Sequence, residues 1–130
     1  MKKGALINGP LSSVVAQMGH KERIVVADAG LPLGNLPRID LALTAGIPTF
    51  IDTLQTLLSE LEVEAAIIAE ELPQKNPDVY RELVRQLGSA HIQSMPHEQF
   101  KQELPSCKAA VRTGEFSPYA NVILISGVVF

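Results

Sequence analysis

The sequence predicts an α/β protein, a single three-layer α/β/α domain over residues 1–130 with a mainly parallel or mixed sheet. The first observation behind this prediction is that apolar runs of strand length alternate along the chain with amphipathic segments of helical period. The second is that the apolar runs have no polar residue at every other position, which is typical of strands covered on both faces. The helical segments between them favour parallel pairing, because parallel strands need a long crossover connection.

In the first half of the chain, a helix is predicted over residues 10–18, where apolar side chains recur at spacings of three and four until a glycine ends the pattern. Residues 23–27 are predicted to form a buried strand around three consecutive branched apolar residues. Residues 31–38 are rich in Gly, Pro and Asn and predict a loop, which leads to a second strand at 39–43. Four leucines and a phenylalanine at helical spacing predict the clearest helix over residues 49–62.

The second half repeats this alternation with a different sequence. Residues 64–69 are predicted to form a buried strand, and Asn76 with Pro77 is expected to cap a helix that Gly88 ends. A brief strand at 91–95 and a helical turn at 96–104 follow. The last two strands are predicted at residues 109–111 and 122–125.

Composition narrows the class of protein. Hydrophobic residues make up 46% of the chain and charged residues only 19%, which suggests that partner subunits cover apolar surface in a homo-oligomer. A net charge of -3 without a basic run argues against nucleic acid or an anionic membrane as a partner. The single Cys107 excludes an internal disulfide, and the start of the chain lacks the apolar stretch of a signal peptide. The expected location is the cytoplasm, with no segment in a membrane.

Polar side chains that could bind a small polyhydroxylated ligand occur near both ends of the chain. His20 follows the first predicted helix, and Asp28 comes directly after a buried strand, where α/β sheets usually bind ligands. Tyr119 and Asn121 lie near Pro118, just before the last strand. His97 begins a predicted helix.

Each of these residues also has an ordinary structural interpretation, because histidines after helices interact with carbonyls and Asp, Tyr and Asn are common in turns. His20, Asp28 and His97 could instead bind a metal ion. However, no pair of them is three or four residues apart, as two ligands on one helix would be, and no CxxC, HExxH or DxDxDG motif is present. The glycines form no phosphate-binding motif. Glu70 and Glu71 are interpreted as solvent-facing or turn-capping acids and are left out of the site.

Several short segments occur in an informative order over almost the whole chain. They are residues 1–4, 19–20, 27–32, 63–71, 76–77, 97–101, 112–115 and 117–121. Together they resemble the D-ribose pyranase and fucose mutarotase family of bacterial sugar-handling proteins, and Ala-Asp-Ala-Gly-Leu-Pro at 27–32 is the most recognisable segment. Residues 63–71 and 97–101 are more similar to the ribose branch than to the fucose branch.

The resemblance implies an isomerase that interconverts the pyranose and furanose ring forms of D-ribose without a metal or organic cofactor. By this resemblance His20 is the proton donor. The sugar-binding positions that it implies are Asp28, His97, Tyr119, Ala120 and Asn121. It also implies ring-shaped homo-oligomers, commonly decamers, with each sugar site at a contact between neighbouring subunits.

The chemistry of ring opening agrees with these residue types. The anomeric hydroxyl must lose a proton while the ring oxygen gains one, and histidine, with an unperturbed pKa of about 6.5, exchanges protons near neutrality. The sequence leaves open whether Asp28 or Tyr119 is the second proton carrier. It also leaves open an L-fucose or other sugar mutarotase, a non-catalytic sugar-binding protein of a transport system, and a metal-dependent lyase or hydrolase.

Overall fold

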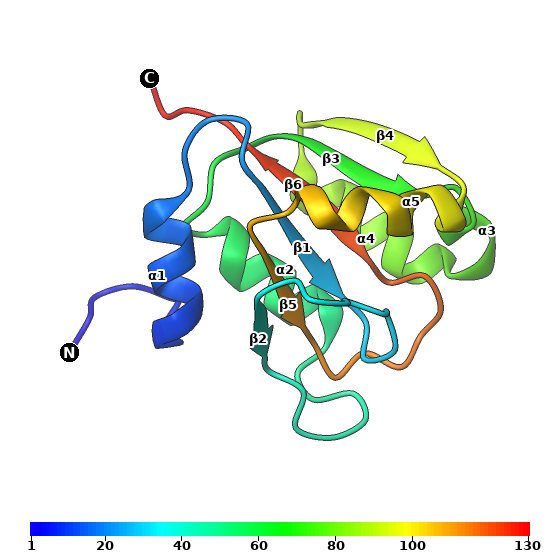
Figure 1. Ribbon diagram of the computed structural model, residues 1–130, viewed down its shortest axis with the longest axis horizontal. Coiled ribbons are helices and arrows are strands. Elements are labelled where there is room, and N and C mark those ends of the chain that lie inside the picture. Colours follow the sequence, from blue (N-terminus) through cyan, green and yellow to red (C-terminus); the bar gives the residue numbers. More distant parts are fainter.

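The computed structural model describes residues 1–130 and contains one six-stranded sheet in the order β2-β5-β1-β6-β3-β4 (Figure 1). The strands are β1 (Arg23–Ala27), β2 (Arg38–Asp40), β3 (Val63–Ala69), β4 (His91–Met95), β5 (Ala109–Arg112) and β6 (Val122–Ser126). The helices are α1 (Gly9–Gln17), α2 (Phe50–Leu58), α3 (Leu72–Lys75), α4 (Pro77–Leu87), α5 (His97–Glu103) and the 3-10 turn η1 (Leu104–Ser106). Helix α5 lies in front of the sheet and α2 and α4 lie behind it in Figure 1, which confirms the predicted α/β class with helices on both faces.

The sheet is mixed because of one strand. β6 is antiparallel to both of its neighbours, β1 and β3, whereas the pairs β1–β5, β2–β5 and β3–β4 are parallel. Residues 113–121 between β5 and β6 contain no helix, so the chain turns back directly and enters β6 in the opposite direction. Since β1 lies between β5 and β6 in the sheet, this link passes over the carboxyl end of β1.

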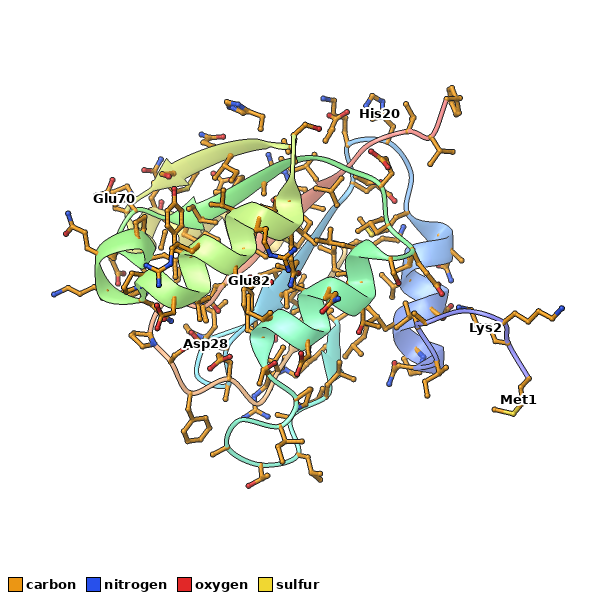
Figure 2. All side chains as sticks on the ribbon, turned by 180° about the vertical axis from the view of Figure 1, so that it is seen from behind. Met1, Lys2, His20, Asp28, Glu70 and Glu82 are labelled. Atoms are coloured by element: carbon orange, nitrogen blue, oxygen red, sulfur yellow. The ribbon has the colours of Figure 1, made fainter.

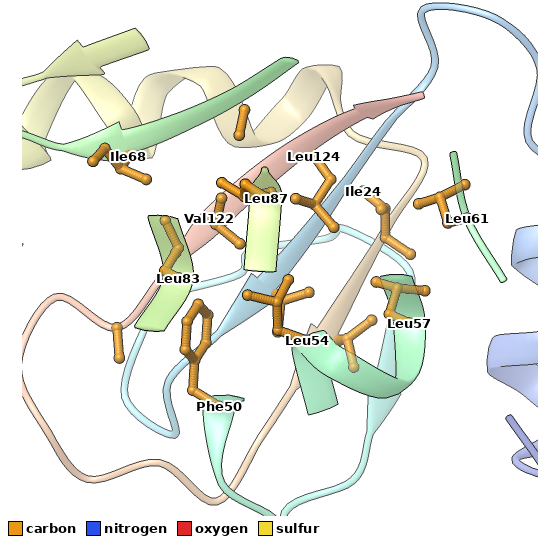
Figure 3. Close-up of a cluster of buried hydrophobic side chains, with 14 of the residues drawn as sticks. Ile24, Phe50, Leu54, Leu57, Leu61, Ile68, Leu83, Leu87, Val122 and Leu124 are labelled. Carbon is orange, nitrogen blue, oxygen red and sulfur yellow. The ribbon is translucent and has the colours of Figure 1, made fainter. Parts of the chain in front are cut away.

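The central strands alternate between two apolar cores. Ile24 and Val26 of β1 face the larger core beneath α2 and α4, which Figure 3 shows in close-up. Val25 and Ala27 face the smaller core on the other side, where Phe100 of α5 is fully buried. This two-sided burial is the reason that the strand sequence shows a continuous apolar run.

Three elements differ from the sequence prediction by more than one residue at an end. Strand β2 ends at Asp40 instead of residue 43, because the Asp40 carboxylate accepts the N–H of Ala42 at 3.1 Å and turns the chain. Helix α2 ends at Leu58 instead of residue 62, and the Ser59 hydroxyl donates to a carbonyl of its last turn. The four-residue helix α3 was not predicted, because one turn is too short to show a hydrophobic period.

Asn76 occupies the N-cap position of α4, as predicted, but its side chain does not cap the helix. Its side chain makes no hydrogen bond to the first turn of α4 and instead donates to Ser117 Oγ and Pro118 O. Pro77 occupies the first position of α4, where a backbone N–H would have no acceptor within the helix, so the lack of an N–H in proline costs no hydrogen bond. At the other end Gly88 adopts a φ of +57° and ends the helix as predicted. None of the helices combines the length and the apolar character needed to cross a bilayer.

Candidate functional site

The candidate sugar-binding residues gather at one edge of the sheet. The carboxyl ends of the five parallel strands meet there, together with the amino end of β6. Asp28 follows β1, His97 begins α5 just after β4, and the 113–121 link carries Tyr119, Ala120 and Asn121. The antiparallel direction of β6 therefore brings two sequence-distant groups of candidates to the same place.

Asp28 and Asn121 form the most closely connected pair. The Asn121 side-chain oxygen accepts the N–H of Asp28 at 2.8 Å, and its amide nitrogen donates to Asp28 Oδ2 at 2.9 Å. Asn121 is fully buried, while Asp28 is only half-buried and receives a second hydrogen bond from the N–H of Gly30 at 2.9 Å. The buried carboxamide thus holds a carboxylate that still has lone pairs for further donors, such as sugar hydroxyls.

His97 and Tyr119 form the second pair. Their rings meet edge to face with centroids 5.1 Å apart, and the His97 ring also stacks on Phe100 at 6.2 Å. Tyr119 has a φ of +58°, an uncommon conformation for a residue with a side chain, and Ala120 beyond it is fully buried. Nδ1 of His97 is buried and has no hydrogen-bond partner among the protein atoms. An imidazole and a phenol are thus held in a fixed relation at the same edge as Asp28.

Glu115 organises the link that carries these residues, and sequence reasoning missed it. One carboxylate oxygen accepts the N–H of Phe50, the first residue of α2, at 3.0 Å, and the other accepts the Ser117 hydroxyl at 3.0 Å. Its backbone carbonyl accepts the N–H of Ala29 at 2.9 Å. An acid at the start of a helix is stabilised by the helix dipole, but nothing in the local sequence shows that residues 115 and 50 meet.

A hollow of about 430 Å³ opens beside Asp28. The residues around it include Arg112, Glu115, Phe116 and Ser117. The Arg112 guanidinium donates to the backbone oxygen of Ala29 at 3.0 Å and pairs with Asp40 at 3.1 Å. A larger hollow of about 510 Å³ lies between the 32–37 loop and the end of α5 and touches none of the predicted site residues.

His20 lies at the opposite edge of the sheet. It precedes β1 whereas Asp28 follows it, and Figure 2 shows the two side chains far apart. Its Nε2 is 2.9 Å from Oε2 of Glu64, and 48% of its side chain is exposed. The hydrogen bond from Lys21 lowers the pKa of the Glu64 carboxyl below its usual range, and the hydrogen bond from His20 lowers it further. Within one chain, Asp28 therefore does not contact or orient His20.

No three His, Cys, Asp or Glu side chains are grouped in a way that could hold a metal ion. Of the acids that the sequence analysis had set aside, Glu71 has a specific contact. Both of its carboxylate oxygens accept the backbone N–H of His97, at 3.1 and 3.0 Å. An acid thus holds the first turn of the helix that carries His97.

Comparison with known proteins identifies the family. The model of the RbsD / FucU transport protein family matches residues 1–129. The chain belongs to this family. The resemblance to the D-ribose pyranase and fucose mutarotase family that the sequence motifs indicated is thereby confirmed.

Relatives of this RbsD / FucU chain are similar over their whole length. The D-ribose pyranase of Coprothermobacter proteolyticus is 54% identical and that of Clostridium botulinum 52% identical, each over the full length of both proteins. The solved structure of Bacillus subtilis RbsD complexed with D-ribose has a TM-score of 0.96 and 42% identity, with both chains fully covered. The fucose mutarotase of Streptococcus pneumoniae in complex with L-fucose has a TM-score of 0.78 and 27% identity, over 95% of each chain. These values agree with the greater similarity of the motifs to the ribose branch.

Proposed function

We propose that the protein is a D-ribose pyranase, an isomerase that interconverts the pyranose and furanose ring forms of D-ribose. The observation that carries this assignment is full-length similarity to proteins with that name, at up to 54% identity. The polar edge of the sheet fits a polyhydroxylated ligand, because it combines a carboxylate, a carboxamide, an imidazole and a phenol. L-fucose is the second candidate sugar, since a fucose mutarotase shares the fold.

The proposed sugar site consists of Asp28, His97, Tyr119, Ala120 and Asn121. The Asp28 carboxylate, held by Asn121, accepts hydrogen bonds from sugar hydroxyls. Tyr119 offers a hydroxyl that both donates and accepts, and its ring contact with His97 fixes the direction of both side chains. Ala120 packs in the larger core and anchors the link between Tyr119 and Asn121.

His20 is the proposed proton donor, and a neighbouring subunit would have to supply it. The support for this is that His20 and Asp28 lie at opposite edges of one chain, while half of the His20 side chain is exposed. General acid-base transfer contributes about 10² to 10⁴-fold to a rate, which suits a ring opening that already proceeds in water. The second proton carrier in this proposal is Asp28 or Tyr119.

Exposed apolar side chains support a head-to-tail assembly. Val129 and Phe130 are 86% and 101% exposed at the His20 edge, where the N–H of Lys21 donates to Ser126 just before this tail. Phe116 is 74% exposed at the Asp28 edge. Contacts between two different faces build closed rings when the rotation closes, and a decameric ring-shaped homo-oligomer is the proposed form. Cytoplasmic ribose catabolism is the proposed setting.

The test of the function is exchange NMR on equilibrated D-ribose, which follows magnetisation transfer between pyranose and furanose anomeric signals. Wild-type protein is expected to accelerate the exchange, and His20→Ala to lose the acceleration while ribose binding measured by calorimetry survives. Asp28→Asn and Tyr119→Phe then identify the second carrier as the variant that binds ribose without exchange. His91→Ala, an exposed histidine on β4, is the matched control. Acceleration with L-fucose but not ribose would overturn the assignment.

A further inference from the structure

The short segment from Glu71 to Asn76 contacts both halves of the sugar site without belonging to either. At its beginning, Glu71 accepts the backbone N–H of His97 with both carboxylate oxygens, at 3.1 and 3.0 Å. A hydrogen bond to an ionised acceptor is roughly twice as strong as one between neutral groups. Glu71 thus fixes the position of the first residue of α5, which is His97.

At the other end of the segment, Asn76 holds the 113–121 link. Its amide nitrogen donates to Ser117 Oγ at 2.8 Å and to Pro118 O at 2.9 Å. Asn76 occupies the position before α4 where Asn normally caps a helix, yet its side chain does not do so. The two hydrogen bonds instead fix the two residues before Tyr119, Ser117 and Pro118. The backbone of Tyr119 itself is in the uncommon left-handed conformation.

The contacts form a closed circuit. Between Glu71 and Asn76 lies helix α3, whose Leu72 is fully buried in the larger core. Backbone hydrogen bonds from Lys75 to Glu71 and from Asn76 to Leu72 hold this turn together. The circuit closes where the rings of His97 and Tyr119 meet at 5.1 Å. Helix α3, anchored in the core by Leu72, therefore connects Glu71, which holds His97, to Asn76, which holds the segment before Tyr119.

We propose that Glu71 and Asn76 are positioning residues that set the spacing of His97 and Tyr119 for the sugar. The proposal rests on the proposed function of this site. Each residue acts through backbone or hydroxyl groups of the elements it holds. Because a displacement of about 1 Å can cost 10²-fold in rate, loss of either support is expected to weaken ribose turnover.

Two conservative variants separate positioning from simple stability. Asn76→Asp keeps a residue that caps helices as well as Asn does, but it replaces the donor that faces Pro118 O with an acceptor. Glu71→Gln keeps the size of the side chain and replaces one acceptor with a donor that faces the N–H of His97. Gln74→Glu and Glu70→Gln make the same chemical changes at exposed neighbouring positions and serve as matched controls.

The measurements are kcat and KM for ribose exchange by NMR, ribose affinity by calorimetry, thermal unfolding, and the chemical shift of the His97 ring protons. Asn76→Asp and Glu71→Gln are each expected to lower kcat/KM by about 10 to 100-fold and to move the His97 ring signals, at nearly unchanged Tm. The double variant is expected to lose little more than the worse single variant, because both residues support one pair. The controls are expected to match wild type in every measurement.

Wild-type kcat/KM in both single variants, or losses that the controls share, would overturn the proposal. Unmoved His97 ring signals in both variants would overturn it as well. This readout does not depend on turnover, and the chain has only three histidines to assign. Failure of wild-type protein to act on ribose would instead count against the proposed function, so the two failures are distinguishable.

Discussion

At the residue scale, Asn121 connects the fold to the proposed chemistry. Its carboxamide is fully buried, and it both accepts from the backbone of Asp28 and donates to the Asp28 carboxylate. A buried polar group is costly unless it is paired, so this amide is satisfied only when the end of β1 and the start of β6 are in register. The same two bonds hold the carboxylate proposed to accept sugar hydroxyls.

Asn121→Asp is expected to damage both stability and activity. The substitution places a carboxylate against Asp28 Oδ2 and removes the amide donor, so a buried acceptor faces the half-buried Asp28 carboxylate. We expect the free energy of unfolding in urea to fall by roughly 1–3 kcal/mol and ribose exchange to be lost. Asn35→Asp, the same change on an exposed loop, is the control. Wild-type stability in the Asn121 variant would show that this pair contributes nothing to the fold.

Cys107 gives a pH-dependent prediction. Burial raises the pKa of its thiol from 9.0 to about 11. Between these values the folded protein keeps a proton that the unfolded chain has lost, so stability falls as the pH rises through this window and is unaffected by the thiol below it. The total loss is expected to be roughly 2–3 kcal/mol. Urea unfolding of wild type and Cys107→Ala between pH 9 and 11 measures it. Parallel pH curves for the two proteins would contradict the prediction.

At the element scale, the link between β5 and β6 brings the site together, and Gly114 lets it pack. The link is joined to the 44–48 turn by hydrogen bonds from Gly46 N to Gly114 O at 2.6 Å and from Gly114 N to Pro48 O at 2.9 Å. A Cβ at Gly114 would lie 2.3 Å from the backbone oxygen of Ile47 and 2.6 Å from that of Thr44. The two backbones can approach this closely only at a glycine.

Gly114→Ala is therefore expected to destabilise the protein. The atoms that it meets are backbone atoms of a hydrogen-bonded turn, so either the turn or the link must move. We expect a loss of roughly 1–3 kcal/mol in the free energy of unfolding, together with weaker ribose binding because the link carries Tyr119 and Asn121. Gly9→Ala in α1, where a Cβ meets nothing within 4 Å, is the control and is expected to lose no stability. Equal stability of the two variants would refute this account.

Elements with strong local patterns were predictable, whereas their pairing was not. Strand β1 was predicted with its observed bounds, because three branched apolar residues end at a polar turn. The direction of β6 depends on a link without a helix and on pairing with strands far away in the sequence. The contacts of Glu115 with Phe50 and of Asn76 with the 113–121 link were missed for the same reason, since their partners lie 65 and 41 or 42 residues away. His20 and Asp28 lie at opposite ends of β1, so their separation follows from a strand that the sequence did predict.

At the scale of the whole molecule, the two edges of the sheet carry complementary halves of one proposed reaction. The edge with Asp28 holds the proposed sugar-binding groups, and the edge with His20 holds the proposed proton donor. Both edges also expose large apolar side chains, Phe116 at the first and Phe130 at the second. A monomer would leave this surface in water, and a head-to-tail contact would cover it while bringing the two halves together.

Complementation between two inactive variants tests this arrangement. His20→Ala keeps an intact Asp28 edge, and Asp28→Ala keeps an intact His20 edge, so each is expected to be inactive alone. When the two are refolded together in equal amounts, about one quarter of the contacts between subunits should join two intact edges, and about that share of wild-type exchange should return. Co-purification through a tag on one variant shows that mixed oligomers have formed. If mixed oligomers form and remain inactive, His20 does not act across a subunit contact, because a site within one chain would be broken in every subunit.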